Sequence, residues 1–360
     1  MSTAAAAVAP PTLHDYHPPY WSAVSMPLSP SPSSSSSSSS LLSAQLTLFK
    51  GPSLMKLGHT IDDSRKRYPE ITDELLKSLQ KWADDQDLPK IPEEQLALFA
   101  HSCYFDLAAT KRCMDVYYRM RATIPEFFND RDSRREYLQH SLKALEFVAL
   151  PKPDRNGSRI IFHRLADSRS SQYMFNDGIK LLLMSIDASL YTDGCSPGYI
   201  FLFDMHNVRL GHLTRLSLNS IRWFFEYLQD GMPVRLKAIH VLNAVWFMDK
   251  VLALIRPFMK RELYDMLHVH SGDVSDIYSY IPPESLPKDY NGELDYIANL
   301  HKAHCVKLDQ LRDYFQEEEA LFRNYSLNKA KIANNQNIMQ SATKDLKDRQ
   351  NDDDIVDARC

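Results

Sequence analysis

The spacing of one short segment matches that of a serine nucleophile. Gly194, Ser196 and Gly198 fit the pattern Gly-x-Ser-x-Gly, which holds the serine on a sharp turn between a preceding strand and a following helix. Here the apolar strand candidate, Tyr199–Asp204, comes after the serine instead of before it. The next residue must also donate its backbone N–H to the oxyanion hole, and Pro197 has none. We therefore interpret the segment as a turn that leads into a strand, and we predict no catalytic serine.

Two histidines and one carboxylate are further candidates for chemistry. His268 and His270 lie one residue apart in a predicted strand, so both side chains emerge on one face and could bind a metal ion. The sequence suggests no third ligand nearby, which favours packing over metal binding. Asp204 ends an apolar strand, where a carboxylate more often caps or pairs than catalyses. The chain also lacks the GxxxxGK[ST], GxGxxG and HExxH motifs, so we predict no enzymatic activity, no cofactor and no metal.

The elements around these residues are strongly apolar. A helix expected near 175–190 is apolar almost all round, which is typical of a helix buried on both sides or lying between a sheet and a ligand. Ser185 within it could bond the polar end of a ligand or the backbone carbonyl four residues back. Two clusters rich in aromatic residues follow. One face of the next strand carries Tyr199, Phe201 and Phe203, and the next helix carries Trp223, Phe224, Tyr227 and Leu228. Because aromatic stripes are usually core, the pattern alone favours packing over a pocket.

The segment 243–260 combines an apolar helical face with nearby bases. The apolar positions are Phe247, Val251, Leu254, Ile255 and Phe258. Arg256, Lys260 and Arg261 follow near the end of this helix. Such a helix suits contact with an anionic membrane, although an ordinary helix that covers a sheet with solvated charges has the same pattern.

Composition excludes several classes of protein. A net charge of −4 over 360 residues argues against a nucleic-acid binder that depends on overall charge. The five cysteines are odd in number and form no CxxC pair, so we expect reduced thiols and neither a disulfide framework nor a cysteine zinc site. We find no secretory signal and no apolar run near the ~20 residues of a membrane-spanning helix. We therefore expect a cytoplasmic protein whose membrane contact is peripheral and transient.

The order of patterns predicts the domain organisation and an α/β fold. Between residues 150 and 305, short apolar runs alternate with helical patterns, which indicates a mainly parallel sheet with flanking helices. Low-complexity composition at both ends predicts disordered tails. The predicted parts are a tail over 1–58, a helical domain with its connecting segment over 59–149, an α/β domain over 150–305, a C-terminal helix over 306–331 and a second tail over 332–360.

Five stretches, taken in order, resemble the CRAL-TRIO lipid-binding family. They are RATIPEFF at 121–128, GYIFLFDM at 198–205, MPVRLKAIHVLNAVWFMDKVLALIRPFMKREL at 232–263, LHVHSG at 267–272 and LPKDYNGEL at 286–294. The likeness is greatest to the branch that contains the alpha-tocopherol transfer and cellular retinaldehyde-binding proteins. The family's usual Gly-Gly turn is Asn291-Gly292 here; since asparagine tolerates a positive φ, we expect the turn to be kept.

The resemblance implies a helical N-terminal domain, followed by an α/β domain with an apolar ligand pocket under a mobile gate helix near 245–260. The positions that match the pocket wall are Leu181, Ser185, Tyr199, Phe203, Phe224, Tyr227, Leu228, Met232, Val234, Leu236 and Ile239. The implied gate residues are Val245, Phe247, Val251, Leu254, Ile255 and Phe258. Several of these residues also belong to the aromatic and apolar groups described above, and this agreement favours a pocket over a solid core.

A basic cleft for phosphoinositide headgroups is also implied by the resemblance. Arg235 and Lys237 match the first pair of bases, whereas the second pair falls on Glu262 and Met266. Lys260 and Arg261 lie close to that second pair in the sequence. The expected function is intracellular binding and transfer of a tocopherol-, retinoid- or phospholipid-like ligand, with docking to phosphoinositide-containing membranes. The alternative is a regulator that senses a phosphoinositide or lipid without transporting it. The sequence leaves the ligand and the oligomeric state open.

Overall fold

The computed structural model describes residues 56–331. Most of the predicted tail 1–58 and all of 332–360 therefore lie outside the described residues. The N-terminal part is helical, as predicted. Its helices are α1 (Ile61–Arg67), α2 (Asp73–Asp85), α3 (Glu93–Ser102), α4 (Leu107–Thr123), α5 (Pro125–Phe128) and α6 (Glu136–Ala144). Side-chain caps fix several helix starts: Asp106 accepts a hydrogen bond from the backbone N–H of Ala109, 2.6 Å away, at the beginning of α4.

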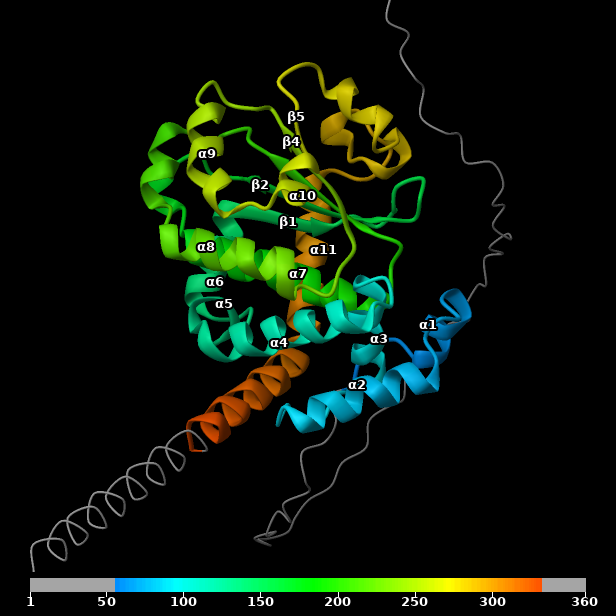
Figure 1. The fold of residues 1–360 in the computed structure, drawn as a ribbon. Coiled ribbons are helices and arrows are strands. Elements are labelled where there is room, and N and C mark those ends of the chain that lie inside the picture. The colour runs from blue at the N-terminus through cyan, green and yellow to red at the C-terminus, as the bar shows by residue number, and fades with distance from the viewer. Residues whose placement is uncertain (1–55, 332–360) are drawn as a thin grey trace, which may run out of the picture. The chain divides into compact units, whose positions relative to one another are not determined.

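A five-stranded sheet follows the helical part (Figure 1). The strands are β1 (Leu145–Ala149), β2 (Arg159–Leu165), β3 (Tyr199–Asp204), β4 (Leu236–Leu242) and β5 (Leu267–Val269). They pair in sequence order; β1 and β2 are antiparallel, and every other pair is parallel. The predicted α/β fold with a mainly parallel sheet is confirmed. The sequence pattern predicts no strand at β1, which follows α6 without a turn and contains only five residues.

Helices connect the parallel strands. They are α7 (Phe175–Asp193), α8 (Leu218–Glu226) with a π-helical turn (Tyr227–Gly231), α9 (Met248–Ile255) and α10 (Arg261–Asp265). Short 3-10 segments are Ser170–Gln172, Leu210–Arg215, Arg256–Phe258, Val274–Ser279, Pro283–Ser285 and Lys288–Tyr290. In Figure 1, α7 lies between the sheet and the layer that contains α4 and α5, and all its residues from Gly178 to Leu190 are buried. This position explains why its sequence is apolar almost all round.

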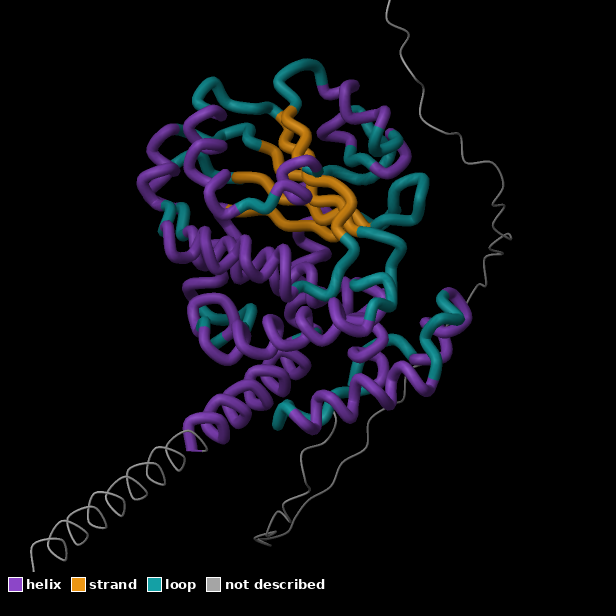
Figure 2. The backbone as a smooth tube through the Cα atoms, viewed as in Figure 1, coloured by secondary structure: helices purple, strands orange, loops and turns teal. Residues whose placement is uncertain are grey.

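Figure 2 shows the strands at the centre, with the long helices on one side and the short helical segments on the other. On the far face, residues such as Ile277, Ile281 and Tyr290 pack on the strands. The expected turn survives: Asn291 has φ 55°, and a Cβ at Gly292 would lie only 2.0 Å from the carbonyl oxygen of Leu286.

Two helices end the described chain. The first, α11 (Ile297–Gln310), packs on β1. A second helix over 312–331 then returns to the helical domain, and a turn at Leu311 separates it from α11. Between residues 56 and 331, no helix combines the length and apolar character that crossing a bilayer requires.

Candidate functional site

A wholly apolar cavity of about 190 Å³ lies between the sheet and α9. Its walls are Phe201, Phe203, Met205, Phe224, Phe225, Leu228, Ile239, Val241, Met248, Val251, Ile255, Met259 and Leu267. None of these side chains carries a hydrogen-bonding or charged group. The cavity can therefore hold only the hydrophobic part of a ligand.

Strand alternation builds the floor of this cavity. Phe201 pairs with Ile239, Phe203 pairs with Val241, and Ile239 pairs in turn with Leu267. Residues two apart on a strand face the same side, so β3, β4 and β5 present these five side chains together. The sequence singled out Phe203 and Ile239 for the cavity, and the same alternation extends to Val241 and Leu267.

The roof of the cavity is α9. Met248, Val251 and Ile255, at helical spacing, line the cavity, yet no residue of α9 is buried. Among the other expected gate residues, Phe247 is buried, Val245 is half-buried, and Leu254 and Phe258 pack partly against the core. The expected gate near 245–260 is thus a thin cover made of one short helix and a 3-10 turn.

A second, larger cavity of about 1050 Å³ opens on the helical domain. It lies between α4 and the segment that enters β4, and Leu228 lines both cavities. Four bases and three acids share its walls: Lys111, Arg112, Arg235 and Lys260 against Asp115, Asp230 and Glu262. The nearly balanced charge distinguishes it from the apolar cavity.

The expected pocket residues fall into three groups. Phe203, Phe224, Leu228 and Ile239 line the apolar cavity, whereas Leu228, Met232, Val234 and Leu236 line the larger one. Leu181, Ser185, Tyr199 and Tyr227 are buried and line neither. The apolar cavity is also lined by Met205, Met248 and Met259. These methionines lie in irregular segments or at helix ends, where the sequence has no hydrophobic periodicity that could predict them.

Two of the buried hydroxyls bond to other protein groups. Ser185 Oγ donates to the carbonyl oxygen of Leu181, 2.8 Å away, and lies 2.8 Å from His304 Nε2. This is the bond to the helix carbonyl, one of the two roles that the sequence left open for Ser185. Tyr199 donates from its hydroxyl to Ser189 Oγ over 3.3 Å. Both hydroxyls are therefore satisfied without a ligand.

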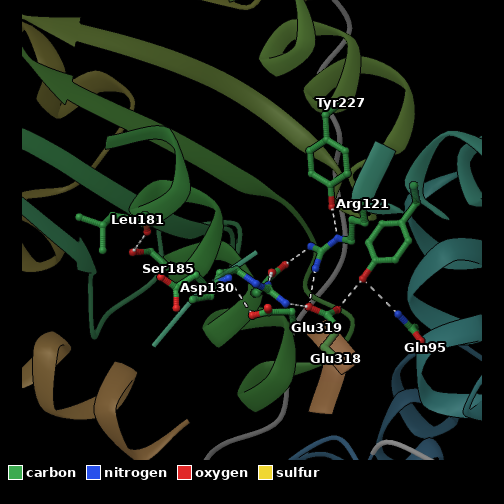
Figure 3. Close-up of polar contacts among 11 residues, drawn as sticks. Gln95, Arg121, Asp130, Leu181, Ser185, Tyr227, Glu318 and Glu319 are labelled. Atoms are coloured by element: carbon green, nitrogen blue, oxygen red, sulfur yellow. Dashed lines mark hydrogen bonds and ion pairs between the residues drawn. The ribbon is translucent and has the colours of Figure 1, made fainter. Parts of the chain in front are cut away.

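Tyr227 joins a buried network of four charges (Figure 3). Arg121 donates through Nε to the hydroxyl of Tyr227 at 2.9 Å and pairs with Asp187 and Glu318, each at 2.6 Å. Arg131 pairs with the same two carboxylates, at 3.1 and 2.5 Å. Burial alone would raise the pKa of Glu318, but the two guanidinium groups hold that pKa below its ordinary value. The network fastens the helix 312–331 to α4 and α7.

The four expected phosphoinositide-binding bases are only partly together. Arg235 donates to the carbonyl oxygen of His101 at 2.7 Å and lies 4.2 Å from the centre of the Tyr104 ring. Lys237 donates to the hydroxyl of Tyr104 at 3.0 Å, so both bases emerge on one face. Lys260 lines the larger cavity with Arg235 and is paired with Asp230. Arg261 lies outside the lining and is 3.6 Å from Asp265.

The histidine pair lies on the opposite face of the sheet from the apolar cavity. His240 on β4 pairs with His268 in register, and its Nδ1 lies 3.0 Å from His270 Nε2. Burial and the two neighbouring imidazoles lower the pKa of His240 to about 3. Although three histidines meet here, no group of histidine, cysteine or acidic residues within 56–331 has an arrangement that could hold a metal ion.

The residues considered for catalysis have structural partners. The segment around Ser196 connects α7 to β3, which confirms the order of helix, turn and strand. Asp204 accepts hydrogen bonds from the backbone N–H of His206 at 2.7 Å and the side chain of Asn243 at 2.8 Å, as well as from the hydroxyl of Tyr290. Asp204 thus caps and pairs at the end of β3, as expected.

These features define a class of protein. Its members have a helical N-terminal part and an α/β domain, and an apolar cavity lies beneath a thin helical cover in that domain. Two family models match the chain: residues 144–292 match the CRAL/TRIO domain, and residues 68–138 match the Pinta-like UBA domain. Residues 144–292 are thus similar to the CRAL/TRIO family, and residues 68–138 are similar to the Pinta-like UBA family. The family resemblance found in the sequence is confirmed.

Several curated proteins are similar over the same region. The alpha-tocopherol transfer protein-like protein of Homo sapiens is 25% identical over 238 residues, which cover 65% of this chain and 64% of that protein. Clavesin-2 of Mus musculus is 23% identical over 242 residues, covering 65% of this chain and 74% of clavesin-2. The chain thus spans slightly less than two thirds of the first relative. The crystal structure of Sfh5 aligns with 68% of this chain and 92% of its own, at 13% identity and a TM-score of 0.46.

Proposed function

We propose that this chain binds one small hydrophobic molecule, or the apolar tail of a lipid, beneath α9 and transfers it between membranes without catalysing a reaction. The observation that carries the proposal is the wholly apolar cavity closed by a helix that has no buried residue. The CRAL/TRIO match and the name of the alpha-tocopherol transfer protein-like relatives support it. Tocopherol-, retinoid- and phospholipid-like ligands all fit this chemistry.

The size of the cavity implies that α9 moves when a ligand binds. A dry apolar cavity of about 150 Å³ holds a molecule the size of benzene, so the 190 Å³ beneath α9 holds only a part of a longer ligand. Each buried CH₂ contributes about 0.8 kcal/mol to binding. Displacing a helix that buries no residue costs far less than opening the sheet beneath it. We infer that α9 swings outward to admit the ligand.

Narrowing the cavity tests the proposal. Val251 faces the cavity from α9, whereas Ala253 on the same helix is exposed. Val251→Phe fills the space and should weaken binding of the co-purifying ligand, identified by mass spectrometry of an organic extract, at least about tenfold, equal to about 1.4 kcal/mol. Ala253→Phe is the matched control and should stay within about threefold of wild type. Equal affinities for the two variants would contradict a ligand site beneath α9.

A sensor that does not transport lipid is the second candidate. It would use the same cavity, and the larger neighbouring cavity offers room for a polar headgroup. Transfer of the identified ligand between two vesicle populations separates the two functions. A carrier accelerates transfer in proportion to its concentration, whereas a sensor binds the ligand and leaves the transfer rate unchanged.

We also propose peripheral docking to phosphoinositide-containing membranes. Trp246 lies at the start of the gate segment, two residues before α9; it is 80% exposed and has Lys250 within 5.8 Å of its ring. An exposed tryptophan beside bases suits a membrane interface. Arg235 and Lys237 add two charges at Tyr104, and each base near an anionic surface contributes about 1 kcal/mol.

Replacing Arg235 and Lys237 together with alanine tests the docking. Binding to phosphoinositide vesicles should fall roughly tenfold or more in co-sedimentation, and salt should weaken the wild type likewise. Ligand binding in solution should hardly change, because neither base lines the apolar cavity. Unchanged vesicle binding at both low and high salt would remove these bases from the mechanism.

A further inference from the structure

The larger cavity presents basic side chains that carboxylates do not neutralise. Lys111 and Arg112 line the cavity from α4. In the part of the chain from 56 to 331, the ion pairs of α4 are those of Arg119 and Arg121. The two cavity bases of α4 therefore have no carboxylate partner among the described residues. Arg235 lines the cavity from the segment that enters β4 and donates to a backbone carbonyl oxygen, so all three bases can bind an anion.

Acids in the cavity wall offset only part of this charge. Lys260 and Asp230 form an ion pair and offset each other. The other acids in the lining are Asp115 and Glu262, against the three bases above. Lys237 adds a further base at the rim, where it donates to the hydroxyl of a tyrosine that lines the cavity. The lining and its rim thus carry a net positive charge, which favours an anionic occupant.

Apolar side chains share the walls with these bases. Trp82, Val116, Leu228, Leu263 and Met266 line the same cavity. Because apolar surface gains free energy when it is removed from water, an occupant should carry apolar groups as well as anionic ones. The volume of about 1050 Å³ is that of a large ligand pocket and has room for a short peptide. The lining therefore suits a peptide that combines carboxylates with a few apolar side chains.

The described chain ends beside this cavity. Lys329, near the end of the helix 312–331, donates to the carbonyl oxygen of Gln86 at 3.0 Å, and Gln86 lines the cavity. The sequence that follows contains DDDIVD at 352–357, which has four carboxylates, two apolar side chains and no base. The residues between them, 332–351, span up to about 70 Å when fully extended. The segment 352–357 can therefore reach back into the cavity.

We propose that the segment 352–357 binds in the larger cavity of its own chain and competes there with anionic lipid headgroups. Its carboxylates pair with Lys111, Arg112 and Arg235, and its two apolar side chains lie against the apolar walls. Because a tethered segment has an effective concentration of up to the millimolar range, weak contacts are enough to hold it. The competition rests on the phosphoinositide docking proposed above, whereas the binding of the segment does not.

Cross-linking of the full chain with a carbodiimide tests the binding, because this reagent joins a lysine amine to a carboxylate where the two are in contact. Peptide mass spectrometry of the monomeric product should find 352–357 joined to Lys111 at least about tenfold more often than to Lys143. Lys143 is the control, since it is exposed on α6 and does not line the cavity. High salt should suppress the cross-link to Lys111. Equal yields at the two lysines, or cross-links confined to covalent dimers, would overturn the proposal.

Two double substitutions test the competition. Asp353→Asn with Asp354→Asn removes half of the carboxylates in the segment and should raise binding to phosphoinositide vesicles about threefold or more, because a larger fraction of the cavities is free. Asp345→Asn with Asp348→Asn is the matched control. It changes the net charge equally, but in the run KDLKDR at 344–349, where bases outnumber acids, and should stay within about 1.5-fold of wild type.

An equal rise in vesicle binding for the two variants would reflect overall charge and would overturn the competition. The cross-linking result separates this proposal from the docking on which the competition rests. If 352–357 is joined to Lys111 and neither variant nor the wild type binds phosphoinositide vesicles, the segment occupies the cavity and the headgroup docking is wrong.

Discussion

The two apolar helices α7 and α9 are used in opposite ways. Every residue of α7 from Gly178 to Leu190 is buried between the sheet and the helical layer, whereas α9 buries none. Beside α7, ion pairs connect elements far apart in the sequence, whereas the apolar cavity lies beneath α9. The hydrophobic effect stabilises both helices, but α9 has far less buried surface to hold it in place. The same sheet face thus carries a fully packed side at α7, called the fixed side below, and a thinly covered side at α9, called the movable side because the proposed function requires α9 to move.

The largest expected effect lies on the fixed side. Glu318→Ala removes one carboxylate from the buried network and leaves Arg121 and Arg131 with a single shared partner, Asp187. Because an uncompensated buried charge is costly, the free energy of unfolding should fall by about 3–5 kcal/mol in urea denaturation. Glu317→Ala, at the exposed neighbouring position, should change it by less than about 0.5 kcal/mol. Similar losses for both variants would mean that the network does not hold the helix 312–331.

A smaller effect is expected on the movable side. Phe203→Ala should weaken ligand binding by about 1–3 kcal/mol, because Phe203 lines the apolar cavity. Phe162→Ala, on the other face of the sheet, is the control; it should lower the free energy of unfolding by about 3–5 kcal/mol and leave the affinity of the folded protein unchanged. If Phe203→Ala abolishes stability while the remaining folded protein binds normally, Phe203 is a core residue and the pocket is misplaced.

Strand alternation and helical periodicity are local, which explains what the sequence could predict. They indicated the parallel strands, the buried helix α7 and the aromatic face of β3. The charged network could not be predicted, because Glu318 meets Arg121 across 197 positions and charged residues are normally exposed. The larger cavity could not be predicted either. It depends on how α4 packs beside β4, and no spacing within the sequence encodes that packing.

Acid should weaken the fixed parts of the fold gradually, by a small amount for each step in pH. Burial lowers the pKa of His304, beside Ser185, and of His240, on the far face of β4, to about 3 in each case. The folded state disfavours their protonation, so the stability that they contribute is present above the unfolded pKa of 6.5 and is lost as pH falls towards 3. Each group should cost up to about 1.4 kcal/mol per pH unit within that window.

Urea denaturation at pH 7.5, 6.5, 5.5 and 4.5 measures this loss. His304→Gln keeps a donor near Ser185 and should reduce the slope of stability against pH below 6.5. A slope that is the same in the variant and in the wild type would show that His304 titrates normally in the folded protein.

Hydrogen exchange of the backbone amides in α9 and α7 tests the movable cover most directly. In the protein freed of ligand, the amides of Met248–Ile255 should exchange at least about a hundredfold faster than those of the buried part of α7, because their opening free energy is lower by about 2.7 kcal/mol or more. Adding back the extracted ligand should slow exchange in α9 and leave α7 unchanged. Equal protection of the two helices in the ligand-free protein would contradict a gate at α9.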